Sequence, residues 1–135
     1  MPGIMGDHDI EGQFGRLIQL VSSPTWRDLW DEMGFTVESF ASMGLSTSSP
    51  DVLVWQTCQE RQVVLVTANR NDDGPDSLEA TIRQYNRAES LPVITIGDPQ
   101  LFSSSRSYAE RAAEKLLDYL SELDRFRGTG RLYIP

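Results

Sequence analysis

The run Val63-Val64-Leu65-Val66 is the feature that most constrains the fold of this chain. An unbroken series of apolar, mostly β-branched residues cannot alternate between a buried and a solvated side. The run therefore indicates a strand that is covered on both faces. Strands of this kind occur in parallel sheets with helices on either side. We therefore predict a central strand over 63–67 in such a sheet.

Shorter apolar stretches on either side of this strand predict the rest of the sheet. Gly3 to Gly6 resembles the end of a first strand, 35–40 alternates weakly, Pro92 to Ile96 is a second buried run, and 132–134 suits a last strand. Helical spacing of apolar residues or helix-start signals appear over about 10–21, 26–33, 51–58, 76–86 and 108–126. This alternation predicts a three-layer α/β domain with a mainly parallel sheet and right-handed crossovers.

Length, charge and cysteine content narrow the class of protein. A chain of 135 residues suits one domain, predicted over 1–135. Its net charge of −8 repels phosphate backbones and argues against a non-specific nucleic-acid coat, although a bound divalent cation would invert the local field. Cys58 is the single cysteine, and neither a signal peptide nor an apolar run of ~18 residues is found. We expect a cytoplasmic protein without a membrane partner.

Helix starts show clear local signals. At the first of them, Ser49 can act as the N-cap, Pro50 fits the first turn, and Asp51 suits the positive end of a helix. Two further starts have the spacing of a capping box: Asp76 with Glu79, and Ser107 with Glu110. These signals give Asp51 and Asp76 a structural explanation that stands beside any functional one.

Acidic and amide side chains follow the predicted strands. Asp7 and Asp9 come after the first strand, the stretch from Asn69 to Asp76 follows 63–67, and Asp51 starts a helix at the same rim. Ligands of open parallel sheets bind at the carboxyl ends of the strands. Clustered carboxylates repel unless protons or a cation hold them, and oxygen ligands suit Mg²⁺ or Mn²⁺. We predict Asp7, Asp9, Asp51 and Asp76 as metal ligands.

Other candidates have simpler interpretations. Asp98, in Gly97-Asp98-Pro99, is typical of a turn, and His8 is more typical of a hydrogen-bonded structural residue. A small hydrolase using Ser46 with His8 is a weaker alternative, because the residues around Ser46 lack the second glycine of a nucleophile elbow.

Three short motifs resemble those of PIN-like domains. They are Asp7-His8-Asp9-Ile10-Glu11-Gly12 after the first strand, Ser49-Pro50-Asp51 at a helix start, and Leu65-Val66-Thr67-Ala68-Asn69-Arg70-Asn71 after the central strand. The chain is most similar to the compact, mostly uncharacterised branch of that family that is related to toxin-type ribonucleases. The resemblance covers nearly the whole chain in the order of its elements.

This resemblance implies a carboxylate pocket for Mg²⁺ or Mn²⁺ that acts on RNA phosphodiesters. Asp7 would be the first-strand acid and Asp51 the helix-start acid. Asn69 and Asn71 stand where that branch commonly has aspartates, so the pocket loses up to two negative charges. Either acidic residues of 72–76 compensate for this loss, or nuclease activity has been lost.

Our leading hypothesis is a metal-dependent phosphodiesterase or ribonuclease. We expect Asp7, Asp51, Asn69 and Asp76 to be catalytic, and Arg70 and Asn71 to bind the substrate. Asp7, Asp51 and Asn69 should then converge in one pocket. The alternative is a catalytically silent PIN-like module that binds a protein partner, such as an antitoxin-like subunit, or forms a homo-oligomer.

Overall fold

The computed structural model describes residues 2–69, 74 and 77–135, and within them every strand pairs in parallel with its neighbours. The sheet has five strands in the order β2-β1-β3-β4-β5. Their bounds are Gly3–Gly6 for β1, Thr36–Glu38 for β2, Val63–Thr67 for β3, Val93–Ile96 for β4 and Arg131–Ile134 for β5. The predicted α/β class is confirmed, and the apolar run forms the middle strand.

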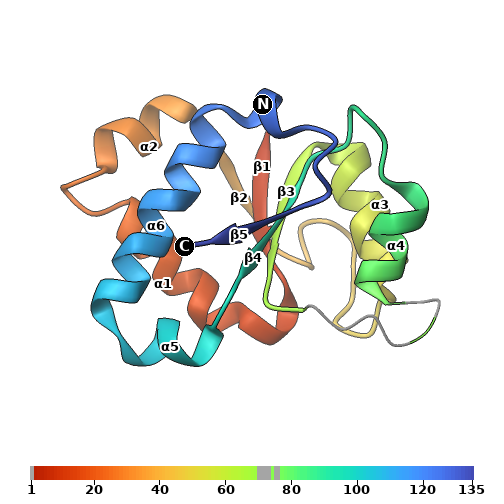
Figure 1. Ribbon diagram of the computed structural model, residues 1–135, viewed down its shortest axis with the longest axis horizontal. Helices are drawn as coiled ribbons and strands as arrows, with labels where there is room; N and C mark the ends of the chain where they lie inside the picture. Colours follow the sequence, from red (N-terminus) through yellow and green to blue (C-terminus); the bar gives the residue numbers. More distant parts are fainter. Residues whose placement is uncertain (1, 70–73, 75–76) are drawn as a thin grey trace.

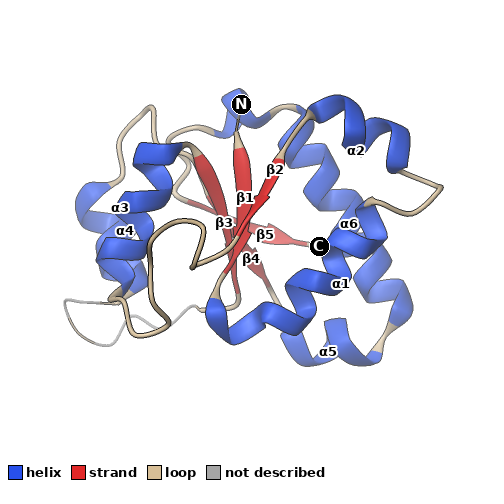
Figure 2. Ribbon diagram, turned by 180° about the vertical axis from the view of Figure 1, so that it is seen from behind, coloured by secondary structure: helices blue, strands red, loops and turns tan. Residues whose placement is uncertain are grey.

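Helices cover both faces of this sheet, giving three layers (Figure 1). One layer holds α1 (Glu11–Val21), α2 (Arg27–Met33), α5 (Pro99–Ser104) and α6 (Arg106–Ser121), and the other holds α3 (Asp51–Arg61) and α4 (Leu78–Tyr85). Two 3₁₀ helices, η1 (His8–Ile10) and η2 (Leu123–Phe126), complete the described elements. Figure 2 shows the same layers from behind. No helix in the described part of the chain is long and apolar enough to cross a membrane.

The position of β3 between two layers of helices explains its apolar composition. All five residues of β3 are buried. Val64 and Val66 pack with α1 and α6, whereas Val63 and Leu65 pack with α3 and α4. Because successive side chains of a strand point to opposite faces, only a continuous apolar run can serve both layers.

Helix α6 supplies most of one layer. Its buried residues are Tyr108, Ala109, Ala112, Ala113, Leu116, Leu117 and Leu120. The alanines let the helix approach the sheet and α1, while each buried leucine contributes about 2 kcal/mol relative to an exposed one. The helix ends at Ser121, earlier than the predicted 126, and η2 continues the chain.

Strand order reverses between β1 and β3. From β1 the chain crosses α1 and α2 to reach β2, and it returns past β1 over α3 on the opposite face to reach β3. In doubly wound sheets the crevice at such a reversal, outside the carboxyl ends of the strands, is the usual ligand site. Asp7 follows β1 directly, and Asn69 lies two residues beyond β3.

The crossovers do not all have the same hand. Both β3 to β4 and β4 to β5 move one strand in the same direction along the sheet. However, α4 lies on one face, whereas α5 and α6 lie on the other (Figure 1). Parallel crossovers that move in the same direction over opposite faces have opposite hands. One of these two crossovers is therefore left-handed, and the expectation of right-handed crossovers throughout is wrong for it. Helix α6 lies on the side of α1 because its apolar face packs against α1.

The predicted starts of α3 and α4 need correction. Helix α3 begins at Asp51 as expected, but its N-cap is Pro50, and the Ser49 hydroxyl instead accepts from the backbone N–H of Ser46. Helix α4 begins at Leu78, and its N-cap is Ser77, whose hydroxyl accepts from the backbone N–H of Ala80. The N-cap is therefore one residue later than the predicted Asp76, which lies outside the described residues. Ser77 is the better-placed cap, and Glu79 has another partner.

The starts of the last two helices also differ from prediction. Asp98 is the N-cap of α5 and accepts from the backbone N–H of Leu101, so it does more than form a turn. Helix α6 begins at Arg106 with Ser105 as its N-cap, not Ser107. Ser105 and Ser107 both offer a hydroxyl, and Glu110 pairs with Arg106 one helical turn earlier instead of closing a capping box.

Candidate functional site

Asp7 is a buried carboxylate at the carboxyl end of β1, with 5% of the residue exposed. Its backbone N–H donates to the carbonyl of Val66 at 2.8 Å, which continues the pairing of β1 with β3. Its Oδ1 accepts from the backbone N–H of His8, and its Oδ2 accepts from the Thr67 hydroxyl, both at 2.8 Å. The carboxylate is therefore fixed between the ends of the two strands where the strand order reverses.

The polar network continues from β3 to α3. The Thr67 hydroxyl accepts from the backbone N–H of Asn69 at 2.9 Å, and the Asn69 side-chain Nδ2 donates to Asp51 Oδ2 at 3.3 Å. Asp7, Thr67, Asn69 and Asp51 thus form one chain of hydrogen bonds. The structure brings together the three residues expected to converge. Thr67 was missed, although a polar residue at the end of an apolar strand was a visible signal.

The carboxylates of this network influence one another. Burial raises the pKa of Asp51, and the negative charge of Asp7 raises it further, whereas hydrogen bonds from the Leu78 backbone and Asn69 act in the opposite direction. Asp9, which is exposed in η1, has its pKa raised by desolvation first, then by Asp7 and, to a smaller extent, by Asp51. Negative charge is therefore concentrated at this rim.

His8 lies beside the network. Its Nδ1 is 3.2 Å from Asp7 Oδ1, and its ring meets Phe40 edge-on with 5.8 Å between centroids. The Ser46 hydroxyl instead lies 3.0 Å from that of Ser48 and shares no hydrogen bond with His8. These contacts give the hydrolase alternative no support, because a serine nucleophile needs its base within hydrogen-bonding reach.

Arg131 is the second residue that the sequence did not reveal. Its guanidinium comes from the edge strand β5 and is 7% exposed. It donates to the backbone carbonyl of Asn69, to the Thr95 hydroxyl and to the carboxylate of Glu79. These partners lie 36–62 positions away in sequence, so no local pattern could indicate them.

Several predicted residues lie outside the described part of the chain. They are the predicted catalytic and metal-binding Asp76, and the predicted substrate-binding Arg70 and Asn71. Asp72 and Asp73, which were considered as replacements for missing charge, also lie outside it. The roles of these residues therefore stay predictions.

The described residues suit a hydrated divalent cation better than a metal ion that is held by three or more side chains. Within residues 2–69, 74 and 77–135, no group of three or more His, Cys, Asp or Glu residues could hold a metal ion. Mg²⁺, however, is commonly bound by one or two carboxylates, with water in the remaining positions. Asp7 and Asp51 offer such a pair, and a cation would offset both the burial and the repulsion from Asp7 that raise the pKa of Asp51.

The fold and this network define a doubly wound α/β domain with an acidic site at its strand-order reversal. Searches with family models, among curated proteins and among solved structures found no match to the chain.

Proposed function

We propose that this chain is a divalent-cation-dependent phosphodiesterase of the PIN-like type that acts on RNA. The observation that carries the proposal is the hydrogen-bonded chain from Asp7 through Thr67 and Asn69 to Asp51. It gathers two carboxylates and an amide at the rim where parallel sheets bind ligands. The raised pKa of Asp51 supports the proposal, because such a carboxylate gains from a neighbouring cation.

Each residue of the network has a proposed role. A bound Mg²⁺ or Mn²⁺ would supply an activated water and stabilise charge on the phosphate. Asp7 and Asp51 would hold the ion, and the Thr67 hydroxyl keeps Asp7 in place. The Asn69 amide would orient the water or a phosphate oxygen. Asp9 would add negative charge near the ion, because Asp7, Asp9 and Asp51 do not form a group of three that could hold it. Asp76 remains a proposed ligand, and Arg70 and Asn71 remain proposed substrate-binding residues.

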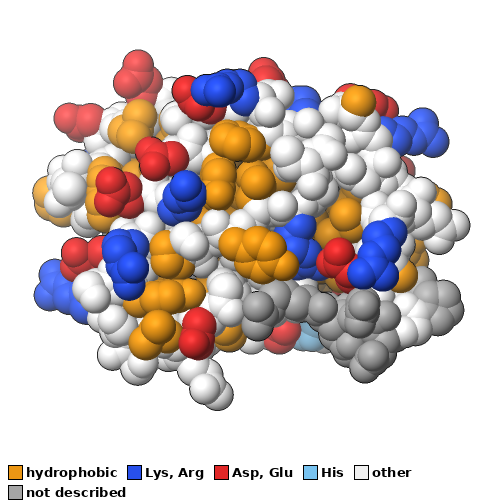
Figure 3. Space-filling view, viewed as in Figure 1, with side chains coloured by type: hydrophobic (Ala, Val, Ile, Leu, Met, Phe, Trp, Pro, Cys, Tyr) orange, Lys and Arg blue, Asp and Glu red, His pale blue; other side chains and the backbone are white. Residues whose placement is uncertain are grey.

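The charge of the surface makes substrate binding depend on the cation. The net charge is −8, and basic side chains are interspersed with acidic ones on the face seen in Figure 3. A surface of this kind does not concentrate phosphate by itself. We therefore expect RNA to bind weakly in chelator and more tightly when Mn²⁺ is present.

The reducing cytoplasm is the proposed location of this activity. Cys58 is a free, buried thiol, and burial raises its pKa to about 12. A thiol of this kind is held as a small apolar core residue and is protected from oxidation.

A catalytically silent module is the second candidate, favoured by one feature of the site. The Asn69 amide donates to Asp51, and Asp7 already accepts hydrogen bonds from Thr67 and His8. Both carboxylates therefore have partners without a metal ion. Such a domain would use its acidic surface to bind a basic protein partner or would form a homo-oligomer.

Thermal melting with Mn²⁺ and with chelator separates the two candidates. A ligand that binds only the folded state stabilises it by about 2.7 kcal/mol at a hundred times its dissociation constant. The enzyme proposal predicts a rise in Tm with Mn²⁺ and Mn²⁺-dependent cleavage of an RNA oligonucleotide. Asp51→Asn should lose both effects, whereas Asp118→Asn, which changes an exposed carboxylate on α6, should keep them. A wild-type protein with neither response would support the silent module.

A further inference from the structure

Arg131 connects the acidic site to the edge of the sheet. Its Nη1 lies 2.8 Å from the backbone carbonyl of Asn69 and 2.7 Å from the Thr95 hydroxyl. Its Nε and Nη2 both donate to Glu79 Oε2, at 3.1 and 2.7 Å. Because the Arg131 side chain is 7% exposed and its guanidinium bonds three separate residues, it is held in one orientation.

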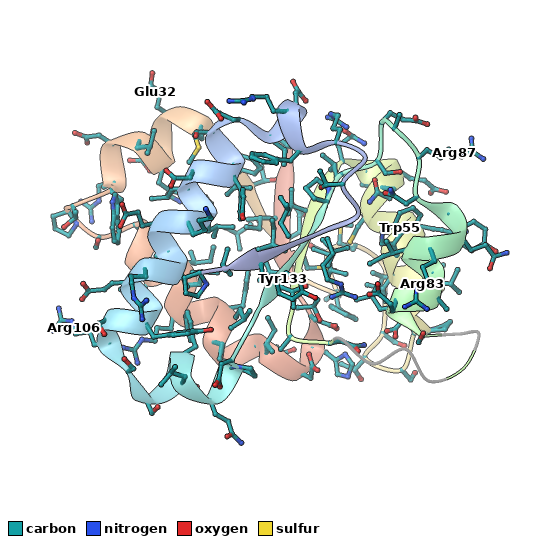
Figure 4. All side chains as sticks on the ribbon, viewed as in Figure 1. Glu32, Trp55, Arg83, Arg87, Arg106 and Tyr133 are labelled. Carbon is teal, nitrogen blue, oxygen red and sulfur yellow. The ribbon has the colours of Figure 1, made fainter. Side chains whose placement is uncertain are left out.

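The surroundings of Arg131 place it on the side of the sheet that α3 and α4 cover. Arg131 and Tyr133 are two residues apart on β5, so their side chains point to the same face. Figure 4 shows Tyr133 in front of the sheet, with Arg83 of α4 beyond it on the same side. Glu79, in the first turn of α4, neutralises the buried charge of Arg131.

Asn69 is held from three directions. Its backbone N–H donates to Thr67, its side-chain Nδ2 donates to Asp51, and its carbonyl accepts from Arg131. The first two bonds lead to the carboxylates of the site, and the third leads out to β5. The bond from Arg131 fixes the backbone carbonyl of Asn69, which is attached to the same Cα as the side chain that meets Asp51.

We propose that Arg131 is a positioning residue for the acidic site. Arg131 holds the backbone of Asn69, so that the Asn69 amide stays aligned with Asp51. This inference deepens the proposed function and rests on it for its catalytic consequence. The positioning of Asn69 by Arg131 does not depend on the proposed function, because the bond between them exists whether or not the site binds a cation. Misplacing a group by about 1 Å in a phosphodiesterase site costs roughly a hundredfold in rate.

Arg127 provides a matched control. Its guanidinium also bonds three separate groups: Asp124, the Glu89 carbonyl and the Gln62 side chain. Gln62 precedes β3, so Arg127 lies at the opposite end of the strands from the site. Lysine keeps the charge at either position but cannot reproduce the planar set of donors. Arg131→Lys and Arg127→Lys should therefore both lower Tm, and only the first should disturb the site.

The test compares wild-type protein, Arg131→Lys and Arg127→Lys by NMR in chelator. We expect Arg131→Lys to shift the Asn69 side-chain amide and the carboxyl carbon of Asp51, and Arg127→Lys to leave both in place. Glu79→Gln, which weakens the hold on Arg131 and keeps an acceptor, should shift the same signals by less, and it serves if Arg131→Lys fails to fold. Unchanged Asn69 signals, or equal shifts with Arg127→Lys, would overturn the proposal.

Cleavage of an RNA oligonucleotide with Mn²⁺ tests the catalytic consequence. Arg131→Lys should lower kcat about tenfold to a hundredfold with little change in KM, and Arg127→Lys should retain the wild-type kcat. An equal loss of kcat in both variants would contradict a positioning role. If the wild-type protein does not cleave RNA, the proposed function fails, and the NMR comparison alone decides whether Arg131 positions Asn69.

Discussion

At the scale of single residues, Asn69 distinguishes this site from an all-carboxylate pocket. It stands where an aspartate would place a third negative charge, and its Nδ2 donates to Asp51 at 3.3 Å. This amide lets Asp7 and Asp51 remain close without a cation, since it supplies a donor where a carboxylate would supply repulsion. We therefore expect Asn69 to lower the affinity of the proposed site for a metal ion.

Asn69→Asp should strengthen the metal dependence of stability. A further carboxylate about 5 Å from another is worth roughly 3 kcal/mol of repulsion at an effective dielectric of ~20, before relaxation and screening. We expect the variant to melt below the wild-type protein in chelator and to gain more from Mn²⁺. It should also cleave RNA faster. Asn69→Ala controls for loss of the hydrogen bond alone. Equal responses of Asn69→Asp and the wild-type protein to Mn²⁺ would argue against a cation at this position.

Thr67→Val should lower the stability of the protein and weaken Mn²⁺ binding, because it removes the hydrogen bond from Thr67 to Asp7. The change leaves a buried Asp7 oxygen without the hydroxyl that now lies 2.8 Å away, which costs about 1–3 kcal/mol. Thr81→Val is the control, because Thr81 is equally buried in α4 and bonds only a backbone carbonyl. Urea unfolding should show a larger loss for Thr67→Val, and only this variant should weaken Mn²⁺ binding. If the two variants lose the same stability and both keep Mn²⁺ affinity, Thr67 has no special role.

At the scale of elements, the apolar patterns determine the sheet and the polar details depend on contacts between distant residues. The run over 63–67 indicates the middle strand because burial on both faces leaves no other composition. Helix caps were misplaced by one or two residues; at α6, Ser105 and Ser107 both offer a hydroxyl, and the sequence does not distinguish them. Arg131 and Glu79 could not be paired from sequence, because 52 positions separate them. The convergence of Asp7 and Asp51 was predictable, because strand ends and helix starts share one rim.

Glycines in and next to α1 give a test of this element. Gly15 is exposed in α1, and a Cβ there would meet nothing within 4 Å, so Gly15→Ala should stabilise the protein by about 0.5–1 kcal/mol. Gly6, just before Asp7, has the opposite environment, since a Cβ would lie 2.3 Å from the Phe14 ring. Gly6→Ala should therefore cost about 1–3 kcal/mol. Chemical denaturation measures both changes, and a stability loss in Gly15→Ala would contradict the open space beside this residue.

At the scale of the whole molecule, the acidic site makes stability depend on pH. The pKa values of Asp51 and Asp9 are raised in the folded chain, mainly by burial and then by Asp7. Between their ordinary value of 3.8 and the raised folded value, the folded chain binds more protons than the unfolded chain. The free energy of unfolding therefore falls as pH rises through this window.

Asp51→Asn should remove part of this pH dependence. In chelator, the difference in unfolding free energy between Asp51→Asn and the wild-type protein should change in favour of the variant as pH rises above 3.8, because the variant carries no charge at this position. Urea titrations from pH 4 to 7 measure the difference, and Asp118→Asn should show no such trend. A constant difference for Asp51→Asn would mean that neither burial nor Asp7 disfavours the charged form of Asp51.

The central claim is that Asp7 and Asp51 form a cation site at the rim where strand order reverses. A crystal grown with Mn²⁺ and measured for anomalous scattering tests this most directly. We predict a Mn²⁺ peak within about 2.0–2.6 Å of an oxygen of Asp7 or Asp51, with the Asn69 amide turned toward the ion or its water. A crystal that contains Mn²⁺ elsewhere but shows no peak beside these carboxylates would contradict the account.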